Sequence, residues 1–367
     1  MAKNVIEFSS DYNEGAHPRL MQRLVETNML QTYGYGLDPY CDEAADIIRN
    51  LCGNKDLDVH MIVGGTLTNL TVIAASLRPH QGVISPTNGH IHVQETGSIE
   101  ATGHKILTIP SVDGKITAAQ IDEYCKDYWN NEGLVHVVQP KLVYITQPTE
   151  FGTLYKKAEL QAIHDACKRN DLYLYVDGAR LGYGMVAEGN DVDLPFLTEC
   201  CDVFYIGGGK QGALFGEAVV IKNKAIAEDF RPILKQRGGL LSKGRLLGIQ
   251  FSELLKDGLY FEIARHANEM AELIRSELKN LGYEFFVENT TNLLFPIFDD
   301  RTYEKLSEKY SFTYYKKLDN ARSVIRIATS WGTQKHNVLE LVNDLKAEQF
   351  AQYNKDRCKL KAEDLAA

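Results

Sequence analysis

The stretch Asp202-Val-Phe-Tyr-Ile-Gly-Gly-Gly-Lys210 joins a short apolar run to three glycines and a single lysine. Its consecutive apolar residues fit a strand that is buried on both faces, as in a parallel sheet covered by helices. Glycine lets a backbone approach a bound group closely, and a lysine at the end of a central strand is costly to bury. The stretch therefore predicts either a reactive lysine at a strand end or an ordinary lysine in a surface loop.

Six other short apolar runs are separated by stretches with helical spacing. The runs cover 59–63, 82–85, Lys105–Ile109, 142–146, 172–176 and 218–221. Apolar residues recur at helical intervals over 158–170, and less clearly over 69–77 and 117–128. This alternation predicts a large α/β domain with a mostly parallel seven-stranded sheet and right-handed crossovers.

The pattern changes after about residue 250. The segment 248–281 predicts one long amphipathic helix that ends at Gly282. Strands are then expected over 283–287, 292–298, 312–316 and 323–328, and a helix from about Gln334 to the tail. We therefore expect an N-terminal arm at 1–45, the large domain at 46–250 and a smaller C-terminal α/β domain at 251–367.

Composition narrows the possible partners. The chain has 367 residues and a net charge of -9, which argues against nucleic acid, because phosphate neutralisation needs clustered Lys and Arg. The first residues carry no apolar signal segment, and no apolar run is long enough to span a membrane. The seven cysteines form no CxxC pair, which is typical of a reduced cytoplasmic protein without a zinc site.

Polar residues follow two of the predicted strands at the edge where ligands bind in open parallel sheets. Asp177-Gly-Ala-Arg180 follows the run 172–176, one predicted strand before Lys210. The carboxylate could pair with a protonated ring nitrogen of a cofactor, and Arg180 could bind a substrate carboxylate bidentately. Alternatively, Asp177 caps a helix and Arg180 forms a structural ion pair.

Further candidates stand after other strands. Gly64-Gly-Thr-Leu-Thr-Asn69 opens a helix, so its backbone and hydroxyl groups could hold a phosphate, or could form a plain capped turn. His90 could stack on a flat cofactor ring, or be an ordinary loop histidine, as we expect for His92 and His104. Arg326 lies inside an apolar strand and needs a carboxylate, from a substrate or from an internal ion pair.

Together these residues resemble the threonine aldolase / β-eliminating lyase family of fold-type I pyridoxal phosphate (PLP) enzymes, over nearly the whole chain. The resemblance implies a fold-type I transferase-like architecture and PLP as cofactor. It implies that Lys210 forms a Schiff base with PLP, that Asp177 binds the ring nitrogen and that His90 stacks on the ring. Gly65 and Thr66 would bind the phosphate. Lys243 or Arg245, after Gly238-Gly239, would reach a partner subunit's phosphate.

The resemblance also implies a substrate site. Ser10, in Ser10-Asp11, and the two arginines Arg180 and Arg326 would contact the substrate carboxylate. Tyr35, in Tyr35-Gly-Leu-Asp-Pro39, would enter the site, often from a neighbouring subunit. We therefore expect a homodimer or homotetramer with shared active sites.

Two positions depart from the family pattern. Gly209 stands where the family usually has a serine that helps to hold the phosphate. Thr146-Gln-Pro-Thr149-Glu150 stands where aldolases have a histidine near the β-hydroxyl of the substrate, so Thr149 or Glu150 would have to act as the base.

The expected function is that of a PLP-dependent lyase. It would cleave the Cα–Cβ bond of a β-hydroxy-α-amino acid, of the L-threonine or L-allo-threonine type, to glycine and an aldehyde. Three alternatives remain at this point: a β-eliminating or β-replacing lyase, an aminotransferase with the same PLP site, and a PLP-binding regulator without catalysis.

Overall fold

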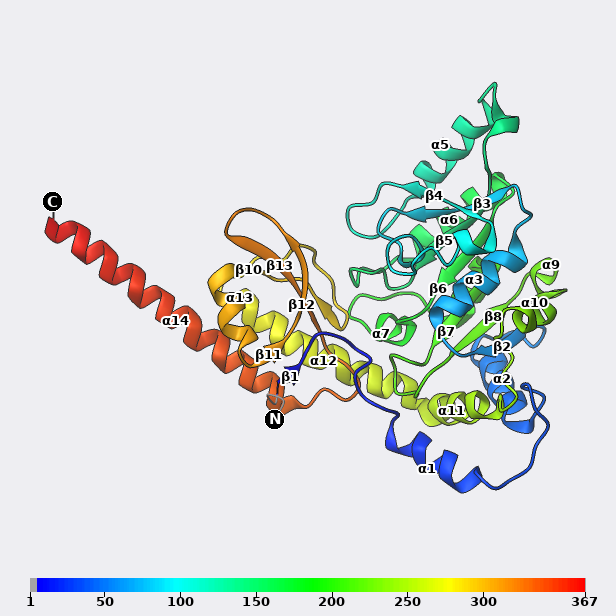
Figure 1. The fold of residues 1–367 in the computed structure, drawn as a ribbon, viewed down its shortest axis with the longest axis horizontal. Helices are drawn as coiled ribbons and strands as arrows, with labels where there is room; N and C mark the ends of the chain where they lie inside the picture. Colours follow the sequence, from blue (N-terminus) through cyan, green and yellow to red (C-terminus); the bar gives the residue numbers. More distant parts are fainter. Residues whose placement is uncertain (1–4, 367) are drawn as a thin grey trace. The chain divides into compact units, whose positions relative to one another are not determined.

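The computed structural model describes the backbone of residues 5–366 and the side chains of residues 5–350, in two compact units (Figure 1). The larger unit is Glu14–Arg265, and the smaller combines Met1–Asn13 with His266–Ala367. This division differs from the expected boundaries after residues 45 and 250. The start of the chain joins the smaller unit because β1 (Ile6–Glu7) pairs in parallel with β11 (Tyr310–Ser311). The rest of the expected arm joins the larger unit through its helices.

The larger unit is built on a seven-stranded sheet with the order β2-β8-β7-β6-β5-β3-β4. The pairing is parallel, except that β8 runs antiparallel to both of its neighbours. The mostly parallel seven-stranded sheet is therefore confirmed, and each predicted run falls within a few residues of a strand. The strands are β2 (Asp58–Ile62), β3 (Gln81–Pro86), β4 (Lys105–Ile109), β5 (Gln139–Thr146), β6 (Tyr173–Asp177), β7 (Val203–Gly207) and β8 (Glu217–Ile221).

The reversed direction of β8 brings its first residue to the functional edge of the sheet. The carboxyl ends of the six parallel strands meet at one edge. Because β8 runs the other way, its amino end lies there: Glu217 pairs with Gly207 at the end of β7 and with Ile62 at the end of β2.

Helices cover both faces of this sheet (Figure 1). On one face, α3 (Gly65–Ser76), α9 (Lys224–Ala227) and α10 (Phe230–Gln236) form a core with apolar residues of the strands. α5 (Ala118–Trp129) and α6 (Lys157–Arg169) contact β5 and β6. The three predicted helices are present, and α3 begins four residues earlier than its apolar pattern. Shorter helices are α4 (His90–Val93), η1 (Glu100–Thr102), η2 (Leu134–His136), α7 (Leu181–Met185) and α8 (Leu194–Cys200).

The single long helix expected over 248–281 is two helices. α11 (Arg245–Leu255) and α12 (Leu259–Asn280) are separated by η3 (Lys256–Gly258). Asp257 and Gly258 adopt φ angles of 54° and 75°, in the left-handed region that an α-helix cannot continue through. Apolar spacing persists across the break, so periodicity alone does not reveal it.

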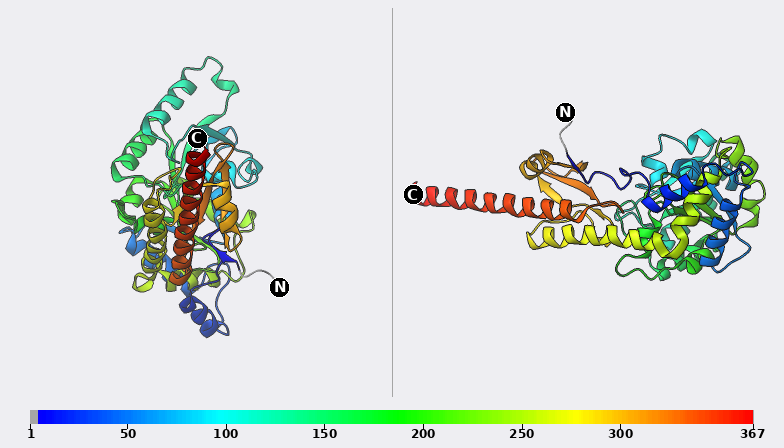
Figure 2. Two further views of the ribbon diagram at one scale, coloured as in Figure 1. Left: turned by 90° about the vertical axis from the view of Figure 1, so that its left-hand side faces the viewer. Right: turned by 90° about the horizontal axis from the view of Figure 1, so that it is seen from below.

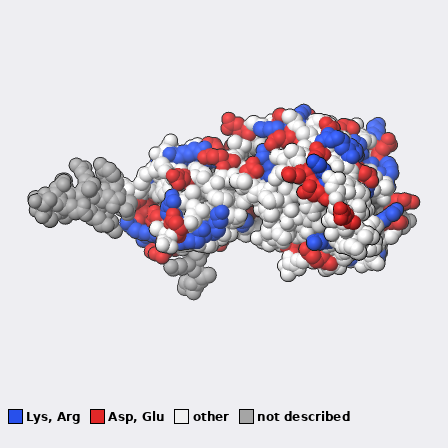
Figure 3. Space-filling view, turned by 90° about the horizontal axis from the view of Figure 1, so that it is seen from above, with Lys and Arg blue, Asp and Glu red and all other residues white. Residues whose placement is uncertain are grey.

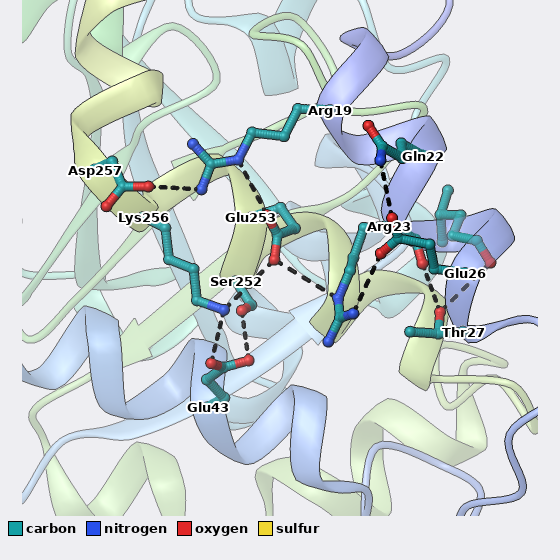
Figure 4. A network of polar contacts seen from close by, with 11 residues as sticks. Arg19, Gln22, Arg23, Glu26, Thr27, Glu43, Ser252, Glu253, Lys256 and Asp257 are labelled. Carbon is teal, nitrogen blue, oxygen red and sulfur yellow. Dashed lines mark hydrogen bonds and ion pairs between the residues drawn. The ribbon is translucent and has the colours of Figure 1, made fainter.

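A polar network ties α11 to α1 (Pro18–Thr27) and α2 (Pro39–Leu51) (Figure 4). Glu253 of α11 accepts from Arg19 of α1 at 3.1 Å. Glu43 of α2 pairs with Lys256 at 2.7 Å and accepts from Ser252 at 2.6 Å. These contacts hold the expected arm, from α1 onward, in the larger unit.

The smaller unit packs a small antiparallel sheet on α12 and on α14 (Lys335–Ala366) (Figure 2). Its strands are β9 (Leu293–Leu294), β10 (Ile297–Asp299), β12 (Thr313–Lys317) and β13 (Arg322–Ala328), with α13 (Asp300–Ser307) between them. The predicted strand 283–287 is wrong, since it contributes only an isolated bridge between Phe285 and Pro296. The predicted strand 292–298 is split at Pro296, which has no backbone N–H for a ladder bond.

Two surface properties complete the description. On the face shown in Figure 3, Lys and Arg side chains are interspersed with Asp and Glu. Within the described part of the chain, no helix is both long enough and apolar enough to cross a membrane.

Candidate active site

Asp177, the last residue of β6, is held by four hydrogen-bond donors. Its side chain is almost completely buried, with the residue 2% exposed. Oδ2 accepts from the Tyr144 hydroxyl at 2.6 Å and from Asn69 Nδ2 at 3.3 Å. Oδ1 accepts from the Tyr205 hydroxyl at 2.5 Å and from the backbone N–H of Ala179 at 2.9 Å. An ionised carboxylate only accepts hydrogen bonds, so this set of donors fits the charged form.

The tyrosines around Asp177 remain neutral donors. Burial, and then the charge of Asp177, raises the pKa of Tyr144, Tyr175 and Tyr205 well above its usual value. Adjacent strands β5, β6 and β7 bring these rings to one face of the sheet, where they join the core against α3.

A second set of contacts links Asp177 to His90. Asn69 accepts from the Tyr175 hydroxyl at 2.6 Å and donates to Glu95 Oε1 at 2.6 Å. The same Glu95 oxygen lies 2.7 Å from His90 Nδ1. Burial lowers the pKa of His90, but the Glu95 hydrogen bond and the charges of Glu150 and Asp177 outweigh it, so the net shift is upward. Glu95 thus orients the imidazole and favours its charged form.

Lys210 lies in the turn after β7, near these charged groups. Its own backbone carbonyl accepts from the Tyr183 hydroxyl at 2.5 Å, which fixes the turn. The Lys210 charge is close enough to lower the pKa of both His90 and Glu217. The structure therefore brings Lys210, Asp177 and His90 to one edge of the sheet, as the sequence predicts.

The turn before α3 has the features of a phosphate cradle. Gly64 is the N-cap and provides no side-chain cap, and a Cβ added there would meet nothing within 4 Å. The first backbone N–H groups of a helix have no partner inside the helix and attract anions. Thr66 is exposed, while the buried Thr68 hydroxyl has no hydrogen-bond partner among residues 5–350. The open space beside Gly64 and the Thr68 hydroxyl would both suit a phosphate group bound at this turn.

Arg180 and Glu150 face each other at the same edge. Arg180 is 6% exposed, and its Nη1 lies 3.7 Å from Glu150 Oε2. The Thr149 hydroxyl is engaged within its own turn: it lies 2.7 Å from the Thr153 hydroxyl and accepts from the Phe151 N–H at 3.2 Å. Of the two predicted bases, Glu150 is therefore the one that faces another candidate residue.

Three other predicted site residues of the larger unit, Tyr35, Lys243 and Arg245, have neighbours other than Asp177 and Lys210. Lys235 Nζ lies 4.3 Å from the centre of the Tyr35 ring. The Arg245 guanidinium donates to the backbone carbonyls of Thr27 and Leu30. Lys243 is exposed and lines a cavity of about 480 Å³ beside residues 24–33. None of these contacts reaches Asp177 or Lys210 in the described residues.

The smaller unit brings Ser10 and Arg326 together. Arg326 Nη2 donates to the carbonyl of Ser9 at 3.1 Å and to the Thr313 hydroxyl at 3.2 Å. The adjacent Ser10 hydroxyl is buried and, in the described part of the chain, has no hydrogen-bond partner. Arg326 therefore fixes the backbone next to Ser10.

The residues at the sheet edge fit PLP. An ionised carboxylate suits its ring nitrogen, the amine of Lys210 suits its aldehyde, and the open helix terminus at Gly64 suits its phosphate. Among the described residues, no group of three or more His, Cys, Asp or Glu side chains could hold a metal ion. Sequence reasoning missed Asn69, Glu95 and Glu217. Of these, Asn69 ends the segment that opens with Gly64, and Glu95 lies five residues after His90; closeness to those candidates was the available signal.

Comparison with known proteins points in the same direction. A family model described as beta-eliminating lyase matches residues 7–301. A low specificity L-threonine aldolase from a Pseudomonas species is 32% identical over 349 residues, covering 94% of this chain and 98% of the relative. The low specificity L-threonine aldolase of Pseudomonas aeruginosa is 30% identical over 356 residues, covering 94% and 99%.

Solved structures agree with the fold. The threonine aldolase of Leishmania major superposes with a TM-score of 0.91 at 41% identity, covering 94% of this chain and 99% of that one. An aspartate aminotransferase of Thermus thermophilus superposes with a TM-score of 0.70 at 13% identity, over 95% and 91% of the two chains. The second likeness supports the fold-type I architecture alone.

Proposed function

Since the chain belongs to the β-eliminating lyase family, we propose that it is a PLP-dependent aldehyde-lyase of the threonine aldolase type. It cleaves the Cα–Cβ bond of L-threonine or L-allo-threonine to glycine and an aldehyde. The similarity to threonine aldolases over 94% of the chain supports this reaction.

The observation that carries the proposal is the environment of Asp177 beside Lys210. When bound, PLP supplies an electron sink for the bond that breaks at Cα. Asp177, kept as an acceptor by its four donors, holds the ring nitrogen in its protonated form. Lys210 provides the amine that holds the cofactor, and His90, oriented by Glu95, covers the ring. Gly65 and Thr66 bind the phosphate at the start of α3.

Arg180 is the proposed ligand of the substrate carboxylate. Its guanidinium is buried against Glu150, so an incoming carboxylate replaces one anionic partner by another. Glu150, once released, is the proposed base for the proton of the β-hydroxyl group. Thr149 supports the turn that carries Glu150. Ser10 and Arg326 are proposed as further carboxylate ligands. The Arg326 contact with the Ser9 carbonyl and the Ser10 hydroxyl, which has no hydrogen-bond partner in the described residues, support this.

We also propose a homodimer or homotetramer with shared active sites. Exposed apolar side chains gather on α1 and the loop after it: Met21, Val25, Met29, Leu30, Tyr33 and Leu37. Tyr35 lies in the same segment, and the exposed Lys243 is better placed than the engaged Arg245 to serve a partner subunit's phosphate. A cytoplasmic location, and the absence of nucleic-acid and membrane partners, complete the proposal.

The test is an aldehyde-release assay with PLP-loaded protein over L-threonine, L-allo-threonine, phenylserine, serine and cysteine. Wild-type protein is expected to release the aldehyde from the β-hydroxy amino acids, and Lys210→Ala to release none. Release of ammonia and pyruvate from serine or cysteine, without aldehyde from threonine, would instead identify a β-eliminating lyase. Transfer of the amino group to the cofactor would identify an aminotransferase.

A further inference from the structure

Glu217 is a buried carboxyl at the functional edge that no step above uses. It opens the antiparallel strand β8, between the carboxyl ends of β2 and β7. The residue is 8% exposed, and Oε2 accepts from the backbone N–H of Gly208 at 3.2 Å. Within the described part of the chain, its other oxygen, Oε1, has no hydrogen-bond partner. Oε1 is not among the fully buried atoms of the described residues that lack a partner, so it is open to a ligand at this edge of the sheet.

Oε1 of Glu217 lies near two glycines. A Cβ added to Gly65, in the phosphate cradle, would lie 3.9 Å from Glu217 Oε1. A Cβ added to Gly209, just before Lys210, would lie 3.8 Å from the same oxygen. Oε1 therefore lies beside the start of α3 and beside Gly209, the position where the family resemblance leads us to expect a serine.

We propose that Glu217, in its protonated form, donates a hydrogen bond to the phosphate group of PLP and replaces the serine hydroxyl that is absent at Gly209. The proposal rests on the PLP site described above. It assigns this chain a phosphate ligand that comes from β8.

The charges around Glu217 make a protonated carboxyl the expected form at neutral pH. The pKa of Glu217 is raised to about 8: burial raises it most, the Lys210 charge lowers it, the Asp177 charge raises it and the Gly208 N–H lowers it. The other titratable groups that face it are the neutral phenols Tyr175, Tyr205 and Tyr260. A phosphate monoester is a dianion above pH of about 6, so an ionised carboxylate beside it would repel it, whereas a carboxylic acid donates to it.

The test compares two ligands of cofactor-free protein, PLP and pyridoxal, which lacks the phosphate. Their dissociation constants are measured from the absorbance of the lysine-bound ring between pH 6 and pH 9. Both ligands share the pH dependence of Lys210, so the ratio of their affinities isolates the phosphate end. For wild type, the preference for PLP over pyridoxal is expected to fall about tenfold from pH 7 to pH 9, because binding is linked to the protonation of Glu217.

Three variants distinguish a Glu217 that binds the PLP phosphate from a Glu217 that only supports the fold. Glu217→Gln keeps a donor without an ionisable proton, so its preference for PLP should stay high and independent of pH. Glu217→Ala should lose most of the preference at pH 7. Adding Gly209→Ser to Glu217→Ala should restore it, since the serine Cβ meets its neighbours at ordinary distances of 3.7–3.8 Å. Glu253→Gln, in the distant network of Figure 4, is the matched control and should behave as wild type.

Unfolding midpoints of the cofactor-free variants identify any loss that comes from misfolding. An unchanged PLP-to-pyridoxal ratio in folded Glu217→Gln and Glu217→Ala, at every pH, overturns the proposal. So does a pH-dependent ratio that persists in Glu217→Gln. Neither result depends on aldehyde release, so the role of Glu217 and the proposed reaction can fail separately.

Discussion

Glu150→Gln tests whether the Glu150 carboxylate acts as the general base or only as the anionic partner that orients Arg180. Glu150 Oε2 lies 3.7 Å from Arg180 Nη1, with the glutamate side chain 23% exposed and the arginine side chain 6% exposed. At an effective dielectric constant of about 20, Coulomb's law gives about 4.5 kcal/mol for this attraction, and partial exposure reduces it. A substrate carboxylate must displace this attraction before it can bind Arg180.

The variant should therefore lower kcat without raising KM. Loss of a general base lowers kcat by about 10²- to 10⁴-fold. Loss of the competing anion removes one anionic partner of Arg180, so KM for L-threonine should stay the same or fall. Both constants are measured by coupled aldehyde release. Glu159→Gln serves as a control, because Glu159 pairs with Lys115 at 2.8 Å on α6 and should leave both constants unchanged.

Two results would refute the reasoning about Glu150. A kcat close to that of wild type would show that another group, or water, removes the hydroxyl proton. A rise in KM with kcat retained would show that Glu150 only orients Arg180. A variant in which kcat falls and KM rises would be checked for folding by its unfolding midpoint, and in a folded variant this result would also refute the loss of a competing anion at Arg180.

Three further predictions concern the residues around the site and the helix break. Asp177→Asn should lower the unfolding free energy of cofactor-free protein by about 2–4 kcal/mol in urea, because buried donors lose their charged acceptor; an unchanged midpoint would contradict the hydrogen-bond set. Glu95→Gln should lower the pKa of His90 in an NMR titration, since the Glu95 bond is the main cause that raises it. The stabilisation that the raised His90 pKa provides is present below about pH 6.5, and it is lost as pH rises through the folded-state pKa. Glu95→Gln should therefore weaken the dependence of the unfolding free energy on pH in this range. An unchanged dependence would count against Glu95 as the group that raises the His90 pKa. Gly258→Ala should lower the unfolding free energy by about 1 kcal/mol because φ is 75° there, and equal stability would show that the break tolerates a side chain.

Much of the site could be predicted because strand ends are visible in the sequence. Asp177, Lys210 and the Gly64 turn each follow a continuous apolar run, and parallel strands necessarily bring their carboxyl ends together. The helix break at Asp257-Gly258 was missed for a local reason: apolar spacing continues on both sides, and the positive φ angles are set by the backbone. The point at which the N-terminal segment divides between the two units, after residue 13, was missed because the β1–β11 pairing joins residues about 300 positions apart, which no local pattern encodes.

Glu217 illustrates the limit of such reasoning most clearly. A strand buried on both faces shows no alternation, so its sequence does not reveal its direction. Read as another parallel strand, the run 218–221 would put Glu217 at the edge opposite Lys210. The antiparallel pairing of β8 with β7 reverses this and sets the carboxyl beside the glycine that replaces the expected serine. The departure at Gly209 and the buried acid at Glu217 are thus two sides of one local arrangement. In the proposed arrangement, Glu217 supplies from β8 the donor that Gly209 lacks.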